Sequence, residues 1–422
     1  MRRTLTAMAL LLGLPLSAAA CLWDRDTPAD EAKGLPEVVA VLTGRFARNP
    51  PLFYEMRLAH ASARIREHPD DLDAYDDAGV ACDRLGRGDE AIAWMEKKRA
   101  RMPIPPLDPE APATREHRYR YHANLGTFLV HRWIRRGADR SKIDEAKAAR
   151  EEIAQALAIN PDAHFGREKY QLKAIDWIIA PPKVQQGFTL PNLLGWSFDD
   201  IYSQETRPQE AREAVRGLSG LIVLGNAWES LDVFHALNVA LQRDSTGFER
   251  GREGGRNTLA YLAWLRCREL IDAGKGSMLP DAPKGEALKA MLRRPDFVQA
   301  EELLDPAFEE LRAEAEAWQS ARTSFMLKRL KQGHHPDTDS HFWDGYTESP
   351  PPKLPSTSVP QAFASWQKRR ALLALSLIGG SLALLIGVTI GIALWANRQD
   401  ARGTRRHQSE SPAEFPFASW ED

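Results

Sequence analysis

Apolar residues recur three or four positions apart along most of the chain, which is the spacing of one face of an α-helix. Alternation of apolar and polar residues, the pattern of a half-buried strand, appears over no useful length. Glycine, asparagine and proline separate several of the helical segments into pairs. We therefore predict an all-α chain built largely from helical hairpins, with helical spacing in residues 51–67, 71–103, 122–161, 161–180, 210–243, 259–273 and 304–330.

The clearest hairpin pattern lies in residues 71–103. Gly79 leaves room for a second helix to cross close by, and Ala91 does the same from the other side. Tyr75 and Met95 are expected to fill the seam between the two helices. Residues 85–89 predict a helix end, a tight turn and a new helix start, so the two helices should be antiparallel neighbours.

This spacing resembles a tetratricopeptide repeat, in which small and large residues at fixed intervals join two antiparallel helices. The matching positions hold Tyr75, Ala78, Gly79, Cys82, Ala91, Met95 and Pro103. Lys98 stands where the family usually keeps a small residue, so we expect looser packing onto the following repeat there. The resemblance implies an α-solenoid, because stacked hairpins bury apolar faces that a lone hairpin leaves exposed.

A longer copy of the pattern occupies residues 122–161, with matches at His122, Leu125, Gly126, Leu129, Ala149, Ile153, Ala156 and Pro161. The step from Gly126 to Ala149 is 23 residues, against 12 from Gly79 to Ala91. We expect the extra residues to lengthen each helix by about a turn and a half, with a turn near residues 137–139. Residues 205–300 are interpreted as degenerate helical repeats. Residues 304–330 predict an amphipathic helix that either covers the open end of the stack or forms a coiled-coil seam.

Two further apolar segments predict export and membrane anchoring. Residues 1–20 combine Arg2 and Arg3, an apolar run and small residues before a cleavage site, the composition of a secretory signal. Cys21 follows that site and resembles a lipoprotein acceptor, which leaves lipidation and plain cleavage as alternatives. Residues 371–396 contain 26 positions without a charge, enough to span a bilayer. The predicted topology exports the N-terminal part and leaves residues 397–422 in the cytoplasm.

The predicted membrane helix carries small residues at every fourth position, Gly379, Ala383, Gly387 and Gly391. Such a row lets two helix backbones approach closely, so a homodimer through this helix is one hypothesis. The general frequency of glycine in membrane helices is the competing explanation. The chain then divides into a signal peptide (1–20), an N-terminal segment with a flanking helix (21–69), tetratricopeptide-like repeats (70–180), degenerate repeats with the amphipathic helix (205–332), a Pro-rich linker (333–367), the membrane helix (371–396) and the tail (397–422).

The charge and cysteine content of the chain argue against some classes of function, nucleic-acid binding first among them. The chain has 422 residues, 43% of them hydrophobic, and a formal net charge of −2. Its basic residues are scattered among acidic ones, so we do not expect nucleic acid as a partner. Three cysteines form neither a disulfide framework nor a metal-binding spacing, and Cys82 and Cys267 fall at apolar positions where we expect them buried.

Motifs for catalysis are missing from the sequence, including phosphate-binding loops, nucleophile elbows and zinc-protease signatures. We therefore expect neither an enzyme nor a cofactor. Residues 334–341 collect ligand types for a divalent metal ion, but they lie in a Pro- and Asp-rich stretch that favours a solvated loop. The candidate ligands are His334, His335, Asp337, Asp339 and His341.

The resemblance also implies a binding surface, since tetratricopeptide arrays generally bind peptides along the concave face of their first helices. The corresponding residues here are Asp73, Asp76, Val80 and Asp83. Their negative charge favours a basic or apolar segment of a partner protein. The leading interpretation is a non-catalytic, membrane-tethered extracytoplasmic scaffold. The alternatives are a structural subunit of an envelope complex, or an enzyme or metal-dependent envelope factor with a site in residues 181–300 or 334–341 and the repeats as its docking module.

Overall fold

The computed structural model describes residues 22–27, 34–102, 111–161, 166–185, 187–196, 208–243, 253–295 and 301–350. Their regular secondary structure is helical throughout, and no strand occurs among them. Residues 1–354 form one compact unit and residues 355–422 another. The second unit lies outside the described residues, as do the predicted signal peptide, Cys21 and the predicted membrane helix with Gly379, Ala383, Gly387 and Gly391. Among the helices that are described, none has the length and apolar character needed to cross a membrane.

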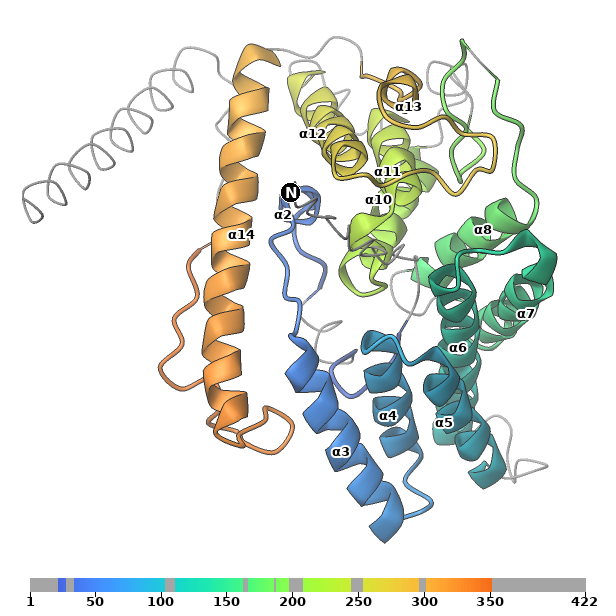
Figure 1. Ribbon diagram of the computed structural model, residues 1–422, viewed down its shortest axis with the longest axis vertical. Helices are drawn as coiled ribbons and strands as arrows, with labels where there is room; N and C mark the ends of the chain where they lie inside the picture. The colour runs from blue at the N-terminus through green and yellow to red at the C-terminus, as the bar shows by residue number, and fades with distance from the viewer. Residues whose placement is uncertain are drawn as a thin grey trace, which may run out of the picture. The chain divides into compact units, whose positions relative to one another are not determined.

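Successive helices from α3 to α12 pack against one another in chain order, and each hairpin continues into the next (Figure 1). The prediction of an all-α chain is confirmed for the described residues. The helices are α2 (Val38–Thr43), α3 (Pro51–Glu67), α4 (Leu72–Arg84), α5 (Gly88–Arg101), α6 (Pro112–Arg135), α7 (Ile143–Ile159), α8 (Arg167–Ile179), α10 (Pro208–Val223), α11 (Leu231–Arg243), α12 (Glu253–Asp272), α13 (Glu286–Ala290) and α14 (Glu301–Lys331).

Helices α4 and α5 form the hairpin predicted for residues 71–103. The Asp71 side chain accepts a hydrogen bond from the Ala74 N–H at 3.2 Å and caps α4, while Gly86 turns the chain with φ +78°. A Cβ atom on Gly79 would lie 2.9 Å from Met95 Cε and 3.0 Å from the Phe128 ring. Gly79 therefore permits the close contact with both α5 and α6 that its spacing predicts.

Helices α6 and α7 form the longer hairpin, with its turn at Gly137 and Ala138, both at positive φ. A Cβ atom on Gly126 would lie 2.9 Å from the Ala149 carbonyl oxygen. Between Gly126 and the turn, and between the turn and Ala149, each helix is about one turn longer than the matching part of the first hairpin. This is less than the turn and a half expected, because the connection takes the remaining residues and forms the short 3-10 helix η1 (Arg140–Lys142). The two hairpins share an apolar cluster that includes Val80, Met95, Leu125 and Phe128.

Helices α10 to α12 belong to the same packed unit as the first hairpins. A contiguous core cluster joins buried residues of α6 to α8 with those of α10 to α14. Asn226, in the left-handed conformation, turns the chain between α10 and α11 near the 3-10 helix η3 (Ala227–Glu229). Helix α12 begins at Glu253, earlier than the predicted residue 259. Cys82 and Cys267 are buried free thiols, as expected.

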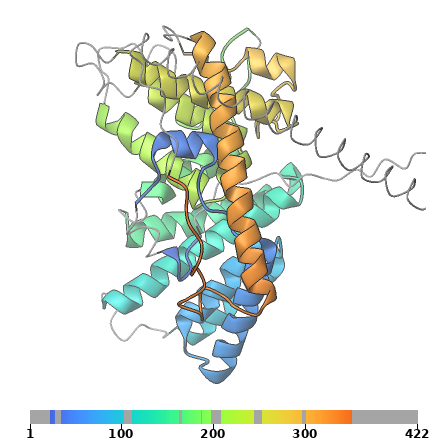
Figure 2. The ribbon, with the colours of Figure 1, turned by 90° about the vertical axis from the view of Figure 1, so that its left-hand side faces the viewer.

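Helix α14 runs along the array and does not cap its end. It packs against α12, α2 and α3, which lie far apart in the sequence (Figures 1 and 2). Its apolar face is buried within the same chain, through residues such as Leu311, Ala315, Trp318 and Met326. The expectation of a terminal cover is corrected, because α14 is long enough to connect the α12 side of the unit to α3.

Residues 334–350, called the C-terminal extension here, fold back onto α14 and α3. Phe342 is buried in a cluster with Phe53 of α3 and with Met326 and Leu330 of α14. Trp343 stacks on Phe325 with ring centroids 5.9 Å apart. The start of the predicted linker is therefore an ordered part of the unit, because its aromatic residues find apolar partners.

Candidate functional site

Residues 22–27, called the N-terminal segment here, lie across α4 and α6. The Trp23 N–H donates to Asn124 Oδ1 at 2.8 Å, and Asn124 Nδ2 donates to the Trp23 carbonyl oxygen at 3.0 Å. Asn124 is fully buried on α6. One amide side chain thus satisfies both main-chain groups of Trp23, as a neighbouring strand would do in a sheet.

Asp77 of α4 holds the segment at a second point. Its carboxylate accepts the Arg25 main-chain N–H at 3.0 Å through Oδ1 and the Arg25 Nε at 3.0 Å through Oδ2. Burial and the neighbouring carboxylate of Asp24 raise the pKa of Asp77 to about 6. This carboxylate therefore binds a proton at mildly acidic pH.

Leu22 and Trp23 enter two different apolar clusters on this surface. Leu22 joins the cluster of the first two hairpins, next to residues such as Val80. Trp23 packs with Tyr119, Ala123 and Ala156, and its ring meets that of Tyr119 edge to face at 6.0 Å. We call this surface of α4 and α6, defined by Asp77, Val80, Tyr119, Ala123 and Asn124, the α4–α6 face.

A buried ion pair lies beside the Asn124 contact. Lys98 of α5 donates to both carboxylate oxygens of Asp76 at 2.7 and 2.6 Å, and Asn124 Nδ2 donates to Asp76 Oδ1 at 3.1 Å. Burial raises the pKa of Asp76 and lowers that of Lys98, and the ion pair opposes both shifts. The expectation of looser packing at Lys98 is corrected, because Asp76 supplies a partner for the buried ammonium group.

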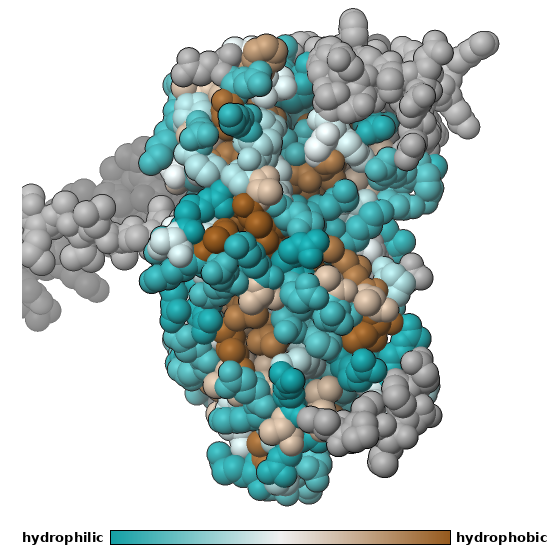
Figure 3. Space-filling view, turned by 90° about the vertical axis from the view of Figure 1, so that its right-hand side faces the viewer, coloured by the Kyte–Doolittle hydropathy of each residue, from teal (hydrophilic) through white to brown (hydrophobic). Residues whose placement is uncertain are grey.

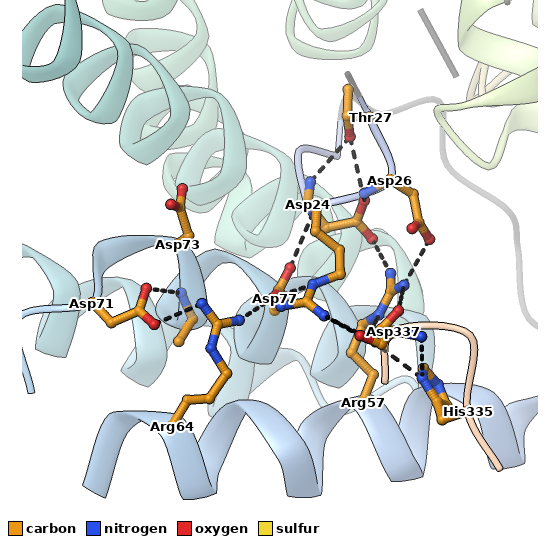
Figure 4. A network of polar contacts seen from close by, with 12 residues as sticks. Asp24, Asp26, Thr27, Arg57, Arg64, Asp71, Asp73, Asp77, His335 and Asp337 are labelled. Carbon is orange, nitrogen blue, oxygen red and sulfur yellow. Dashed lines mark hydrogen bonds and ion pairs between the residues drawn. The ribbon is translucent and has the colours of Figure 1, made fainter. Parts of the chain in front are cut away.

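Arg57 of α3 connects the N-terminal segment to the C-terminal extension (Figure 4). Its guanidinium donates to Asp24 at 2.8 Å, to Asp26 at 2.7 Å and to both oxygens of Asp337 at 2.9 and 2.6 Å. It also stacks over the Phe53 ring at 4.5 Å. The nearby carboxylates raise the pKa of this buried guanidinium against the effect of burial, so it stays charged.

His335 fixes the C-terminal extension on α3. Its Nδ1 accepts the Asp337 N–H at 3.1 Å, so Nε2 carries the proton of the neutral ring and donates to the Phe53 carbonyl oxygen at 3.0 Å. Burial lowers the pKa of His335, which favours this neutral form. The solvated-loop expectation is therefore wrong for His335, which is buried, and for Asp337, whose side chain is buried against Arg57.

Three of the four residues expected on an exposed concave face are buried. Asp76 pairs with Lys98, Val80 packs in the cluster that contains Leu22, and Asp83 pairs with His131 Nδ1 at 2.7 Å on α6. Asp73 is exposed and pairs with Arg120 at 2.7 Å. The expectation of an open acidic surface is therefore corrected. Basic side chains of the same chain pair with its carboxylates, and the N-terminal segment covers part of its apolar area.

One group of potential metal ligands occurs in the described part of the chain, Asp73, Asp76 and His117, with ligand atoms within 4.8 Å of one another. Asp76 is paired with Lys98 and Asp73 with Arg120. A cation would have to displace two basic side chains, so these residues do not fit a resident metal. In the predicted cluster, both ring nitrogens of His335 are engaged, and Asp339 pairs with His334 and Arg329.

Two further hollows lie on the described surface, one away from the α4–α6 face and one that reaches Val80 of that face. On the side of the unit shown in Figure 3, apolar residues form separate patches among hydrophilic ones. A hollow of about 940 Å³ is lined by residues of α8 and by residues 182–196, including Trp177, Trp196 and Phe188, of which Phe188 is 67% exposed. A second cavity of about 1040 Å³ lies among the N-terminal segment, α2, α14 and the C-terminal extension.

Sequence reasoning missed Asn124, Asp77 and Arg57. Asn124 and Asp77 occupy positions next to the predicted Leu125 and Asp76. A polar residue at an inward-facing helical position indicates a buried hydrogen bond, and this signal could have identified both. Arg57 lies in a helix whose apolar spacing was recognised, but its partners come from residues 24–26 and 337. Comparison with protein-family models, curated proteins and solved structures finds no match to this chain.

Proposed function

We propose that this protein is a membrane-tethered, extracytoplasmic helical-repeat scaffold that binds a basic or apolar segment of a partner protein on its α4–α6 face. The observation that carries the proposal is the N-terminal segment itself. Its main chain is held by the side chains of Asn124 and Asp77, and its side chains enter two apolar clusters. Main-chain hydrogen bonds for affinity and side-chain pockets for specificity are the recurring chemistry of peptide recognition.

The resemblance to tetratricopeptide repeats supports the same assignment. Gly79 and Gly126 permit close helix contacts at the family positions, and the α4–α6 face is built from the first helix of each predicted repeat. Its carboxylate, Asp77, favours a partner segment with a basic side chain, as Arg25 illustrates by pairing with Asp77.

The tether is proposed from the sequence. A signal at residues 1–20 and the uncharged residues 371–396 would place residues 21–370 outside the membrane. A membrane-impermeant maleimide should therefore label the Asp144→Cys variant in intact cells. An unlabelled cysteine at this exposed position would contradict the sidedness.

Site-specific photo-crosslinking in membranes tests partner binding. Asp73 and Asp144 are both exposed acidic residues in the first turn of a helix, but only Asp73 borders the α4–α6 face. A photoreactive amino acid at position 73 should crosslink a discrete partner protein, whereas the same amino acid at position 144 should not. Equal crosslinking at both positions, or none at position 73, would contradict the proposed function.

A further inference from the structure

The main chain of the N-terminal segment contacts the helices in the manner of a bound peptide. Its hydrogen bonds to them run through side chains of Asn124 and Asp77, with a longer contact from Arg167 to the Leu22 carbonyl oxygen at 3.5 Å. Within the described part of the chain, the segment thus contributes no ladder or helical hydrogen bond to the array. The helices pack directly against one another, so the array does not need the segment to hold it together.

The surface beneath the segment retains its polar partners without it. Asp76 keeps Lys98 and Asn124, and Asp77 keeps Arg64, whose Nη1 lies 3.1 Å from its carboxylate. The close helix contacts at Gly79 and Gly126 involve only α4 to α7. An emptied α4–α6 face would therefore keep its geometry and expose two apolar pockets beside an ordered row of polar groups.

Arg57 is likewise satisfied without the segment, because its bidentate contact with Asp337 joins α3 to the C-terminal extension alone. Asp24 and Asp26 add to this contact from the N-terminal segment. The segment therefore has two anchors, the guanidinium of Arg57 and the α4–α6 face. Asp337 keeps Arg57 paired even when the segment leaves.

On the basis of the proposed function, we propose that residues 22–27 are an intramolecular ligand that occupies the α4–α6 face until a partner segment of the same chemistry displaces it. The chemistry follows from the contacts. The displacing segment carries an aliphatic residue followed by an aromatic residue for the two pockets, and a basic residue two positions after the aromatic one, opposite Asp77. Like residues 24–27, it turns after the aromatic residue, where the Thr27 N–H donates to the Asp24 carbonyl oxygen at 3.1 Å.

Competition by a tethered segment is strong, because a short connection gives an effective concentration of the order of millimolar. A free peptide should therefore bind weakly to the wild-type protein and better when the resident segment is weakened. Trp23→Ala combined with Arg25→Ala removes the side chains that fill one pocket and pair with Asp77, while leaving the face itself unchanged.

The test uses the full-length protein in detergent and a fluorescent, end-blocked peptide with the sequence of residues 22–27. We expect the double variant to bind this peptide at least about tenfold more tightly than the wild type, a difference of about 1.4 kcal/mol. Adding Asn124→Ala to the double variant should reverse the gain. A matched peptide with alanine and glutamate in place of its tryptophan and arginine should not bind.

Equal affinity of the wild type and the double variant, or no binding to either with helical content unchanged, would overturn the inference. Arg25→Ala alone is the milder variant, because its side chain is partly exposed, and it should change affinity in the same direction if the double variant loses helical content. A wild-type dimer formed by exchange of N-terminal segments, seen by light scattering, would overturn the assignment to a partner.

The inference and the proposed function fail differently. Suppose that a partner crosslinks at position 73 equally in the wild type and the double variant, and that the double variant gains no affinity for the peptide. This result overturns the inference and leaves the proposed function intact. If the double variant binds the peptide more tightly but no partner crosslinks at position 73, the intramolecular ligand is supported and the proposed function is overturned.

Discussion

At the scale of single residues, polar groups inside the first repeats decide what the α4–α6 face can bind. Asp76, Lys98 and Asn124 form a buried network whose members satisfy one another. Such networks are stable when complete and costly when one member is lost, because the remaining charge stays buried without a partner. The network therefore supports the face from below.

Replacement of Lys98 tests this network. Lys98→Met should lower the free energy of unfolding by about 3–5 kcal/mol, because the Asp76 carboxylate keeps its burial and loses its counter-charge. The double variant Asp76→Asn with Lys98→Met should recover much of this loss. Lys97→Met, on the exposed neighbour that stacks on Trp94 at 3.9 Å, should cost about 1 kcal/mol or less. Urea unfolding followed by circular dichroism measures all three, and equal costs at positions 97 and 98 would contradict the account.

Protonation of Asp77 gives a pH dependence of defined sign. Its pKa in the folded protein is raised from the ordinary 3.8 to about 6, mainly by burial and then by Asp24. The folded state therefore binds more protons than the unfolded state between about pH 4 and 6, so the stability contributed by this group decreases as pH rises through that window, by about 3 kcal/mol.

The comparison of the wild type with Asp77→Asn isolates this contribution. The difference in unfolding free energy between the two proteins should shift in favour of the variant as pH rises from 4 to 6.5. Urea titrations at three pH values in this range measure the shift. A difference that stays constant with pH would mean that Asp77 keeps an ordinary pKa.

At the scale of helices and hairpins, the sequence predicted elements well where local spacing determined them. The residues of α3 and the first hairpin follow from apolar spacing and from the turn predicted at residues 85–89. The role of α14 did not follow, because an amphipathic pattern shows that a face is buried and not which elements cover it. The contacts of Arg57 were hidden for the same reason, since residues 24–26 and 337 meet α3 only in the folded chain.

Glycine at the helix crossings gives a prediction at this scale. Gly126→Ala should destabilise the protein by about 1–3 kcal/mol, because its Cβ would meet the Ala149 carbonyl oxygen at 2.9 Å and backbone cannot move aside cheaply. Gly220→Ala in α10 is the matched control, since the nearest atoms to its Cβ lie at 3.6 Å. That substitution should be neutral or stabilising by up to about 1 kcal/mol through helix propensity. Thermal unfolding compares them, and the opposite order would refute the close crossing.

At the scale of the whole described unit, Arg57 joins three segments that are distant in sequence. It contacts the N-terminal segment through Asp24 and Asp26 and the C-terminal extension through Asp337, while α3 carries it (Figure 4). The two ends of the described chain are therefore energetically coupled through one buried guanidinium.

Arg57→Met should release both ends together. We expect faster amide hydrogen exchange in residues 22–27 and in residues 334–338, with α6 and α7 unchanged, because the loss leaves several carboxylates close together without their shared cation. Arg64→Met is the matched control, since Arg64 pairs with Asp71 and Asp77 at a partly exposed position of the same helix. Faster exchange at only one end, or an equal effect of both variants, would contradict the coupling.

Both the proposed binding surface and the intramolecular ligand require that the N-terminal segment lies on the α4–α6 face. Residue-level hydrogen exchange of the wild-type full-length protein measures this through the Trp23 and Arg25 amides, which donate to Asn124 Oδ1 and Asp77 Oδ1. We predict that both amides exchange at least about 100-fold more slowly than in an unstructured peptide, and that Asn124→Ala accelerates exchange at Trp23. Exchange at both amides as fast as in the free peptide would contradict the central claim.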